Sequence, residues 1–87
     1  MKKIIVTGGC GFIGTNFIKN QLLKTKNKIL NIDKLTYSAN KDNLSEYSNS
    51  LNYRFIEGDI CNTSLIRSSF KDFSPNIVIN FAAETHV

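Results

Sequence analysis

The feature that most constrains this fold is a run of glycines between a short apolar segment and a longer helical one. Residues 4–6 (IIV) form a β-branched run that predicts a buried strand, and TGGCGFIG follows at positions 7–14. Apolar residues then recur at helical spacing: Phe12, Ile13, Phe17, Ile18, Leu22 and Leu23. The glycines therefore lie where a strand turns sharply into a helix, the setting in which a glycine-rich motif binds phosphate.

Glycine suits such a turn because it has no Cβ and tolerates positive φ. We predict that Gly8 and Gly9 form the tight turn. Gly11 is expected to let the backbone approach a pyrophosphate, and Gly14 to let the helix pack closely on the strand. The free amides and the dipole of the helix N-terminus favour an anion there. The turn predicts a dinucleotide phosphate site; the alternative is that these glycines only punctuate a loop.

A second segment, Lys28–Asp33, reads as a strand that ends in an acid. Asp33 follows Gly14 by about 20 residues, the offset at which a carboxylate accepts hydrogen bonds from a ribose. An acid there without a neighbouring arginine favours NAD over NADP. The alternative is a solvated aspartate at a strand end.

The rest of the chain continues the alternation of strands and helices. We expect strands at 3–7, 28–33, 53–57 and 76–81, helices at 11–24 and 63–73, and a short helix at 41–47. Asn62 is expected to cap the second long helix and Ser74-Pro75 to stop it. Its expected inner face is Leu65, Ile66, Ser69, Phe70 and Phe73.

The order β-α-β-β-α-β predicts an α/β fold with a parallel sheet and right-handed crossovers. In the doubly wound arrangement the strand order is 3-2-1-4, and ligands bind at the carboxyl ends of the strands. The glycine turn, Asp33, Asp59 and residues 82–85 all follow strand ends. Residues 77–79 (IVI) barely alternate, as in a parallel strand covered on both faces.

Composition excludes several other classes. The net charge of +4 in 87 residues comes from scattered lysines, without the basic run or interleaved aromatics of a nucleic-acid site. Cys10 and Cys61 stand alone, so we expect no metal site. Without a run of roughly 20 apolar residues we expect no membrane span. We expect a soluble, cytoplasmic protein.

Four segments resemble known families. The turn at 7–14 resembles that of the extended short-chain dehydrogenase/reductases. Residues 33–40 (DKLTYSAN) are similar to the D-K-L-T-Y-A-G-N segment of the dTDP-glucose 4,6-dehydratases, and residues 58–61 (GDIC) and 82–87 (AAETHV) match that family's G/V-D-I-C and A-A-E-S-H-V. The resemblance covers the whole chain but only the N-terminal quarter or so of the family's length. It departs mildly at Cys10, Ser38-Ala39 and Thr85.

The resemblance implies a role for each matching residue. Phe12 and Ile13 would donate amides to the pyrophosphate, Asp33 would hold the adenosine ribose, and Asp59 and Ile60 would meet the adenine. Residues 81–85 would run under the cofactor towards the nicotinamide, with Thr85 touching the sugar. The cofactor-binding set, including the glycines, is Gly8, Gly11, Phe12, Ile13, Gly14, Asp33, Lys34, Leu35, Thr36, Asp59, Ile60, Phe81, Ala82, Ala83, Glu84 and Thr85; the substrate-binding pair is Thr85 and His86.

The family's reaction oxidises the sugar at C4 with NAD, eliminates water across C5–C6 and returns the hydride to C6. Its Tyr-x-x-x-Lys pair and its proton-transfer residues fall beyond this sequence, so no catalytic residue is assigned. Residues 37–41 (YSANK) fit that pattern literally but are expected at the adenosine end of the cleft. Glu84 and His86 are expected to orient ligand rather than to catalyse.

Residues 1–87 therefore read as the N-terminal part of an NAD-binding Rossmann domain of a nucleotide-sugar dehydratase, with the substrate domain absent. We expect this part to be inactive alone, to leave the fourth strand as an open apolar edge, and to belong to a parent that can be a homodimer. Two alternatives stay open: a non-catalytic NAD-binding module, and the front half of a nucleotide-sugar epimerase or decarboxylase.

Overall fold

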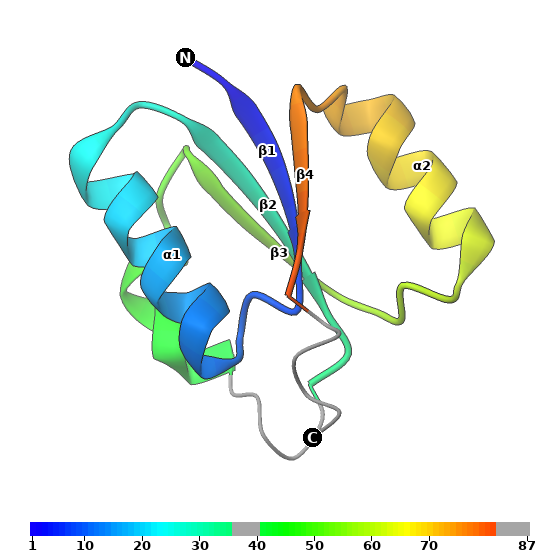
Figure 1. Cartoon of the computed structure of the whole chain (residues 1–87), viewed down its shortest axis with the longest axis horizontal. Helices are drawn as coiled ribbons and strands as arrows, with labels where there is room; N and C mark the ends of the chain where they lie inside the picture. The colour runs from blue at the N-terminus through cyan, green and yellow to red at the C-terminus, as the bar shows by residue number, and fades with distance from the viewer. Residues whose placement is uncertain (36–40, 82–87) are drawn as a thin grey trace.

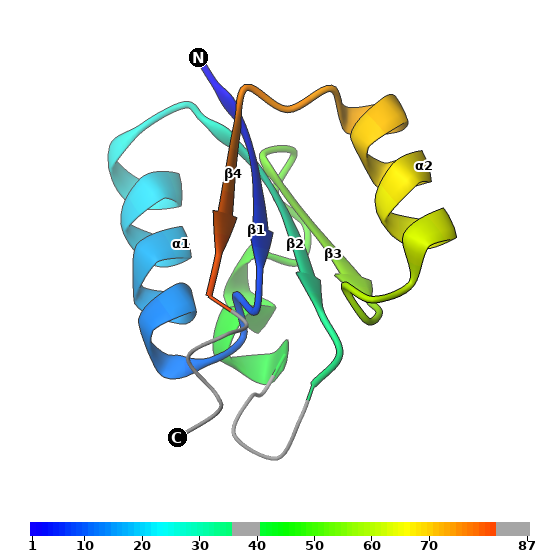
Figure 2. The same ribbon diagram turned by 45° about the vertical axis from the view of Figure 1, so that its right-hand side comes forward.

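A four-stranded parallel sheet organises the computed structural model, which describes residues 1–35 and 41–81. Its strands are β1 (Lys3–Thr7), β2 (Lys28–Asp33), β3 (Tyr53–Glu57) and β4 (Ile77–Asn80). They lie in the order β3-β2-β1-β4, so the predicted α/β class, parallel sheet and strand order are confirmed (Figure 2).

The register brings the carboxyl ends of all four strands to one edge of the sheet. Thr7 at the end of β1 pairs with Ile32 of β2 and with Asn80 of β4. Asp33 at the end of β2 pairs with Glu57 of β3. Residues that follow the four strands are therefore neighbours in space.

Helices cover both faces of this sheet (Figure 1). One face carries α1 (Phe12–Lys24) and the 3-10 helix η1 (Lys41–Tyr47), and the other carries α2 (Thr63–Phe73). The first layer buries one apolar cluster: Ile4, Val6, Ile18, Ile29, Leu44 and Tyr53. The second layer packs against Ile5, Leu30 and Ile32. The alternation along β1 and β2 thus supplies a core on each face, as a doubly wound sheet requires.

The first long helix packs on the sheet through both small and apolar residues. It begins at Phe12, one residue later than expected, because the backbone of Gly11 is extended at ψ 176°. Gly14, Thr15 and Ile18 are its buried residues. Three of the apolar positions that gave the sequence its helical period face solvent instead: Phe12 at 81%, Ile13 at 52% and Leu23 at 73% exposed. The period predicted a helix correctly, and the other three of its apolar positions, Phe17, Ile18 and Leu22, do pack against the core.

The second long helix follows its sequence signals closely. The Asn62 side chain accepts a hydrogen bond from the Leu65 amide at 3.1 Å, which confirms the predicted cap. The helix ends at Ser74, whose φ of 52° is left-handed. One expectation is wrong, because Phe70 is 39% exposed rather than on the inner face. Leu65, Ile66 and Phe73 pack on the core, and Phe70 lies at the margin of that stripe.

Strand β4 corrects a second expectation. Instead of being covered on both faces, Ile77 is 37% and Val78 47% exposed. In the described part of the chain β4 pairs only with β1, so it forms one edge of the sheet (Figure 2). Ile79 alone of its apolar residues packs against a core cluster. The apolar run is therefore the open edge that the sequence also predicted.

Candidate dinucleotide site

The glycine turn follows β1 and begins with a left-handed residue. Gly8 has a φ of 73°, a region that residues with a side chain rarely adopt. Its amide donates to the carbonyl oxygen of Ile32 at 2.9 Å, and its carbonyl oxygen accepts from the Gly11 amide at 3.4 Å. The predicted tight turn is therefore present and is tied to the end of β2.

Two of the other glycines are required by close contacts within the protein. A Cβ at Gly9 would overlap the amide of Asn31, and one at Gly14 would lie 2.7 Å from the Gly8 oxygen. Gly14 thus packs against the turn itself rather than against the strand. A Cβ at Gly11 would meet the Gly8 oxygen at 3.7 Å, an ordinary contact. Of these three glycines, Gly11 is therefore the one at which the protein has space for a Cβ.

The N-terminus of α1 carries no capping side chain. Its N-cap is Gly11, and no acid stands in the first turn. The carbonyl of Gly11 accepts from the Thr15 amide at 2.9 Å, which starts the helical ladder. The amides of Phe12 and Ile13 precede that ladder and have no intrahelical acceptor. Uncapped amides at the positive end of a helix dipole are suited to bind an anion.

Asp33 ends β2 directly beside this turn and is only 7% exposed. Its Oδ2 accepts from the Cys10 amide and its Oδ1 from the Leu35 amide, each at 2.8 Å. Leu35 adopts a left-handed φ of 59° to close that second contact. The two amides use two of the roughly four acceptor positions of an ionised carboxylate, and the Cys10 side chain is a further hydrogen-bond partner of Asp33. Asp33 therefore braces the turn as well as facing the edge where a ribose is expected.

The end of β3 contributes a second acid to the same edge. Asp59 Oδ1 accepts from the Cys61 amide at 2.8 Å, and Oδ2 lies 3.8 Å from the ammonium of Lys34. The Cys61 amide and then the Lys34 charge hold the pKa of Asp59 below its usual range. Ile60, next to it, is 39% exposed. The residues expected around the adenosine thus come from two neighbouring strand ends.

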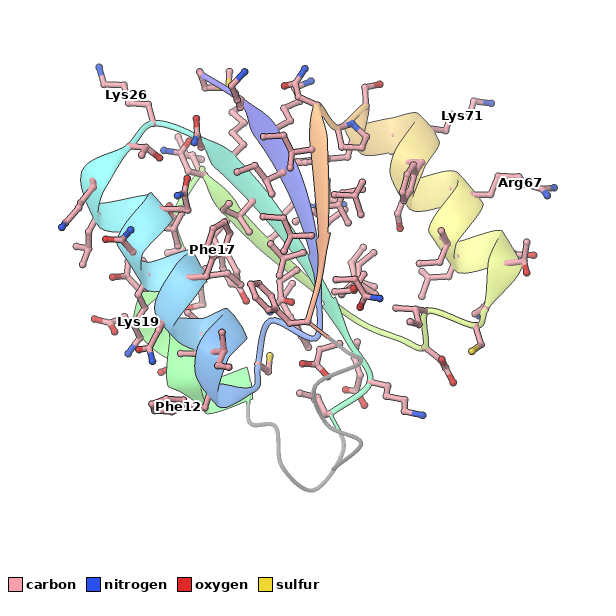
Figure 3. The ribbon with its side chains drawn as sticks, viewed as in Figure 1. Phe12, Phe17, Lys19, Lys26, Arg67 and Lys71 are labelled. Carbon is pink, nitrogen blue, oxygen red and sulfur yellow. The ribbon has the colours of Figure 1, made fainter. Side chains whose placement is uncertain are left out.

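Phe81 follows β4 but turns into the core. Its amide donates to the Thr7 carbonyl at 2.7 Å, and its ring packs on that of Phe17 with centroids 5.6 Å apart. Figure 3 shows Phe17 on the sheet side of α1. The remaining predicted positions lie outside the described residues: Thr36, Ala82, Ala83, Glu84, Thr85 and His86, as do Tyr37–Asn40 of the Tyr-x-x-x-Lys match.

A buried polar cluster beneath the turn was missed by the sequence reasoning. Asn31 of β2 is fully buried; its Oδ1 accepts from the Gly9 amide at 3.0 Å, and its Nδ2 donates to Tyr53 Oη at 3.1 Å and to Cys10 Sγ at 3.4 Å. Thr15 Oγ1 donates to the Gly9 carbonyl at 3.2 Å. A lone amide side chain in the strand KILNID was the available signal.

This cluster stays uncharged over a wide pH range. Burial, followed by the nearby Asp33 charge, raises the pKa of the Cys10 thiol to about 11. Burial likewise raises the pKa of the Tyr53 hydroxyl to about 12. Neutral groups can keep one hydrogen-bond pattern, so the support of the turn does not depend on pH in the physiological range.

The described residues offer neither a metal-binding cluster nor a membrane-spanning helix. Within 1–35 and 41–81, three or more His, Cys, Asp or Glu side chains do not gather in a group that could hold a metal ion. The helices of that same part are all too short or too polar to cross a membrane.

Comparison with known proteins then decides the family. The model of the family described as GDP-mannose 4,6 dehydratase matches residues 5–87. The chain belongs to this GDP-mannose 4,6-dehydratase family. Within it, the chain is 42% identical over 85 residues to the dTDP-glucose 4,6-dehydratase of Salmonella typhimurium, an alignment that takes in 98% of this chain and 24% of that protein.

Solved structures of dTDP-glucose 4,6-dehydratases share the fold. One from Bacillus anthracis, in complex with NAD, superposes with a TM-score of 0.90 at 40% identity and covers 94% of this chain and 27% of that one. Another, from Streptomyces venezuelae with NAD and TYD bound, superposes with a TM-score of 0.83 at 34% identity and covers 98% and 27%. This member of the GDP-mannose 4,6-dehydratase family therefore spans about a quarter of the length of the relatives that it matches.

Proposed function

We propose that residues 1–87 form the N-terminal, NAD-binding part of a nucleotide-sugar 4,6-dehydratase. One observation carries the proposal: the uncapped amides of α1 lie at the same sheet edge as the Asp33 carboxylate, one strand away. A dinucleotide needs both features, one for its pyrophosphate and one for its ribose. The NAD complexes of the similar dehydratases support the choice of cofactor.

Each part of the edge has a distinct task in this proposal. The amides of Phe12 and Ile13 donate to the pyrophosphate, and Gly11 lets the phosphates approach the backbone. Asp33 accepts hydrogen bonds from the ribose hydroxyls, and Asp59 with Ile60 adjoins the adenine. The bound nicotinamide supplies a hydride acceptor; the chain's own residues bind it and orient it.

The substrate class follows from the relatives rather than from residues of this chain. We infer that the parent converts dTDP-glucose to dTDP-4-keto-6-deoxyglucose by C4 oxidation, loss of water across C5–C6 and return of the hydride. The relatives are about four times as long as the matched segment, and we infer that the residues that move protons lie outside it. Residues 1–87 alone are therefore expected to bind NAD without turnover.

A titration of this chain with NAD tests the cofactor, with Asp33→Ala as the decisive variant. The loss of two charged hydrogen bonds to the ribose is expected to raise the Kd at least about tenfold. Glu57→Ala is the matched control, because Glu57 is an exposed carboxylate paired in register with Asp33 one strand further along. We expect it to change the Kd less than about twofold. Equal affinity of Asp33→Ala and the wild-type chain would remove Asp33 from the site.

A chimaera tests the substrate. This chain would replace the matching first quarter of the Salmonella typhimurium dehydratase, and mass spectrometry would follow loss of water from dTDP-glucose. Turnover by the chimaera, with none by residues 1–87 alone, is the expected result. A chimaera that folds and binds NAD but leaves dTDP-glucose intact would favour the epimerase or decarboxylase alternative.

A further inference from the structure

Two successive peptide groups of the glycine turn are each held at both ends, and Asn31, Thr15, Asp33 and the Gly11 amide each supply one of these contacts. The Gly8–Gly9 peptide donates from its amide to Asn31 Oδ1, and its carbonyl accepts from the Gly11 amide. The Gly9–Cys10 peptide accepts at its carbonyl from Thr15 and donates from its amide to Asp33. Neither peptide plane can rotate without losing a hydrogen bond at each end.

Asn31 has the chemistry that this position demands. Its amide is one acceptor and two donors, and it makes three hydrogen bonds, all of them buried. A carboxylate would accept but could not donate to Tyr53 and Cys10, and an apolar side chain would leave the Gly9 amide without its acceptor. The overlap of a Cβ at Gly9 with this same amide shows that turn and strand fit against each other without spare room.

The consequence concerns which donors are left for a ligand. The amides of Gly8, Gly9, Cys10 and Gly11 are all used inside the protein. The next amides along the chain are those of Phe12 and Ile13 at the start of α1. Asn31 thus turns the glycine backbone inward and sets the direction in which α1 begins. An unpaired buried amide is costly, so the loop would rearrange if Asn31 were lost.

We propose that Asn31 is a positioning residue of the phosphate-binding turn, with Thr15 holding the next peptide group from the helix side. The inference rests on the proposed NAD site for its functional consequence, but the geometry of the turn can be measured without any ligand. Asn31 touches neither the cofactor nor the substrate in this proposal; it acts through Gly9.

The test compares Asn31→Leu with Ile29→Val. Both change a buried residue on the same face of β2, but Ile29 packs in the apolar cluster, whereas Asn31 hydrogen-bonds to the turn. Two quantities are measured on the folded chain: hydrogen exchange of the Gly9 and Cys10 amides by NMR without NAD, and the Kd for NAD. We expect Asn31→Leu to speed hydrogen exchange of the Gly9 amide by about tenfold or more relative to the β2 amides. We also expect it to raise the Kd for NAD by about tenfold. Ile29→Val is expected to leave both within about twofold.

The two measurements separate the failure of each proposal. If the wild-type chain bound no NAD, the proposed function would fail, and exchange at Gly9 would still decide the role of Asn31. Unchanged exchange at Gly9 in Asn31→Leu, or an effect of the same size in Ile29→Val, would overturn the positioning role. If Asn31→Leu does not fold, Thr15→Val decides: it is isosteric, removes only the hydrogen bond to the Gly9 carbonyl, and is expected to shift both quantities in the same direction. No shift in either would overturn the proposal.

Discussion

The two long helices of this chain begin in opposite ways. Asn62 caps α2 with its side chain, and an apolar stripe fastens that helix to the sheet. In contrast, α1 begins at a glycine without a capping side chain and packs through Gly14, Thr15 and Ile18. Figure 3 shows Arg67 and Lys71 on the outer side of α2, as expected of an amphipathic helix that covers one face of a sheet.

The proposed phosphate site at the start of α1 accounts for this difference. A side-chain cap on α1 would satisfy the amides that the proposed site needs for phosphate. The turn before α1 is instead held from below by Asp33, Asn31 and Thr15, so rigidity is retained while the helix end stays open. The start of α2 is assigned no phosphate in this proposal, and its amides are capped by the Asn62 side chain in the ordinary way.

The largest expected effect is a loss of stability when a side chain is added where α1 packs against the glycine turn. In Gly14→Ala the new Cβ would lie 2.7 Å from both the Gly8 oxygen and the Gly9 Cα. We expect the free energy of unfolding to fall by about 2–3 kcal/mol, although alanine favours a helix by about 1 kcal/mol over glycine. Urea denaturation measures the change. A stabilised variant would contradict the close packing of α1 on the turn.

The next largest loss of stability is expected when α2 loses its N-cap. Asn62→Ala removes the acceptor of the Leu65 amide, which is expected to lower the free energy of unfolding by about 1 kcal/mol. Because the substitution removes a side-chain contact within α2 and leaves the backbone bond from Asn62 to the Asp59 carbonyl in place, the Kd for NAD should stay within about twofold. Urea denaturation and an NAD titration on the same preparation check both statements. A large loss of NAD affinity would mean that the two helices are coupled.

These elements also show how much of the structure can be predicted from the sequence. The β-branched runs at 4–6 and 77–79 located their strands, and Asn62 and Ser74 located both ends of α2, because those signals act over a few neighbouring residues. The open side of β4 and the exposure of Phe70 depend on what packs against them, which local periodicity does not contain. Asp33 was found as an acid at a strand end, but its hydrogen bond to the Cys10 amide spans 23 residues and needs the fold.

The same limit explains the missed Asn31. An amide within an apolar strand is a signal, but its partners lie on the glycine turn and on β3, which the sequence alone does not bring together. The motif predicted the strand, turn and helix correctly because these three elements are contiguous in the sequence. The residues that support it from the neighbouring strand are not.

A smaller effect on stability is expected when α1 receives the cap that it lacks. Gly11→Asp fits the extended backbone of that position, and its Cβ would have only an ordinary contact with the turn. The carboxylate would cap the first amides and raise the free energy of unfolding by about 0.5 kcal/mol. It would also occupy the donors for pyrophosphate, so NAD should bind at least about tenfold more weakly. A more stable variant with unchanged NAD affinity would show that these amides do not bind phosphate.

The smallest perturbation uses the two cysteines, which lie next to the two helix starts. Cys10 is buried in the turn before α1, and Cys61 is exposed just before α2. The raised pKa of Cys10, about 11, leaves it protonated at pH 8, so iodoacetamide should modify Cys61 first while the chain stays folded. Because the pKa of the folded thiol exceeds the ordinary value, its contribution to stability is complete below about pH 9 and is lost as the pH rises towards 11.

Peptide mass spectrometry after timed alkylation measures the modification of both cysteines, and Cys61→Ser is the control that leaves Cys10 as the remaining thiol. Alkylation of Cys10 as fast as Cys61 in the folded chain would show that the turn before α1 opens as freely as the loop before α2, and the contrast between the two helix starts would be lost.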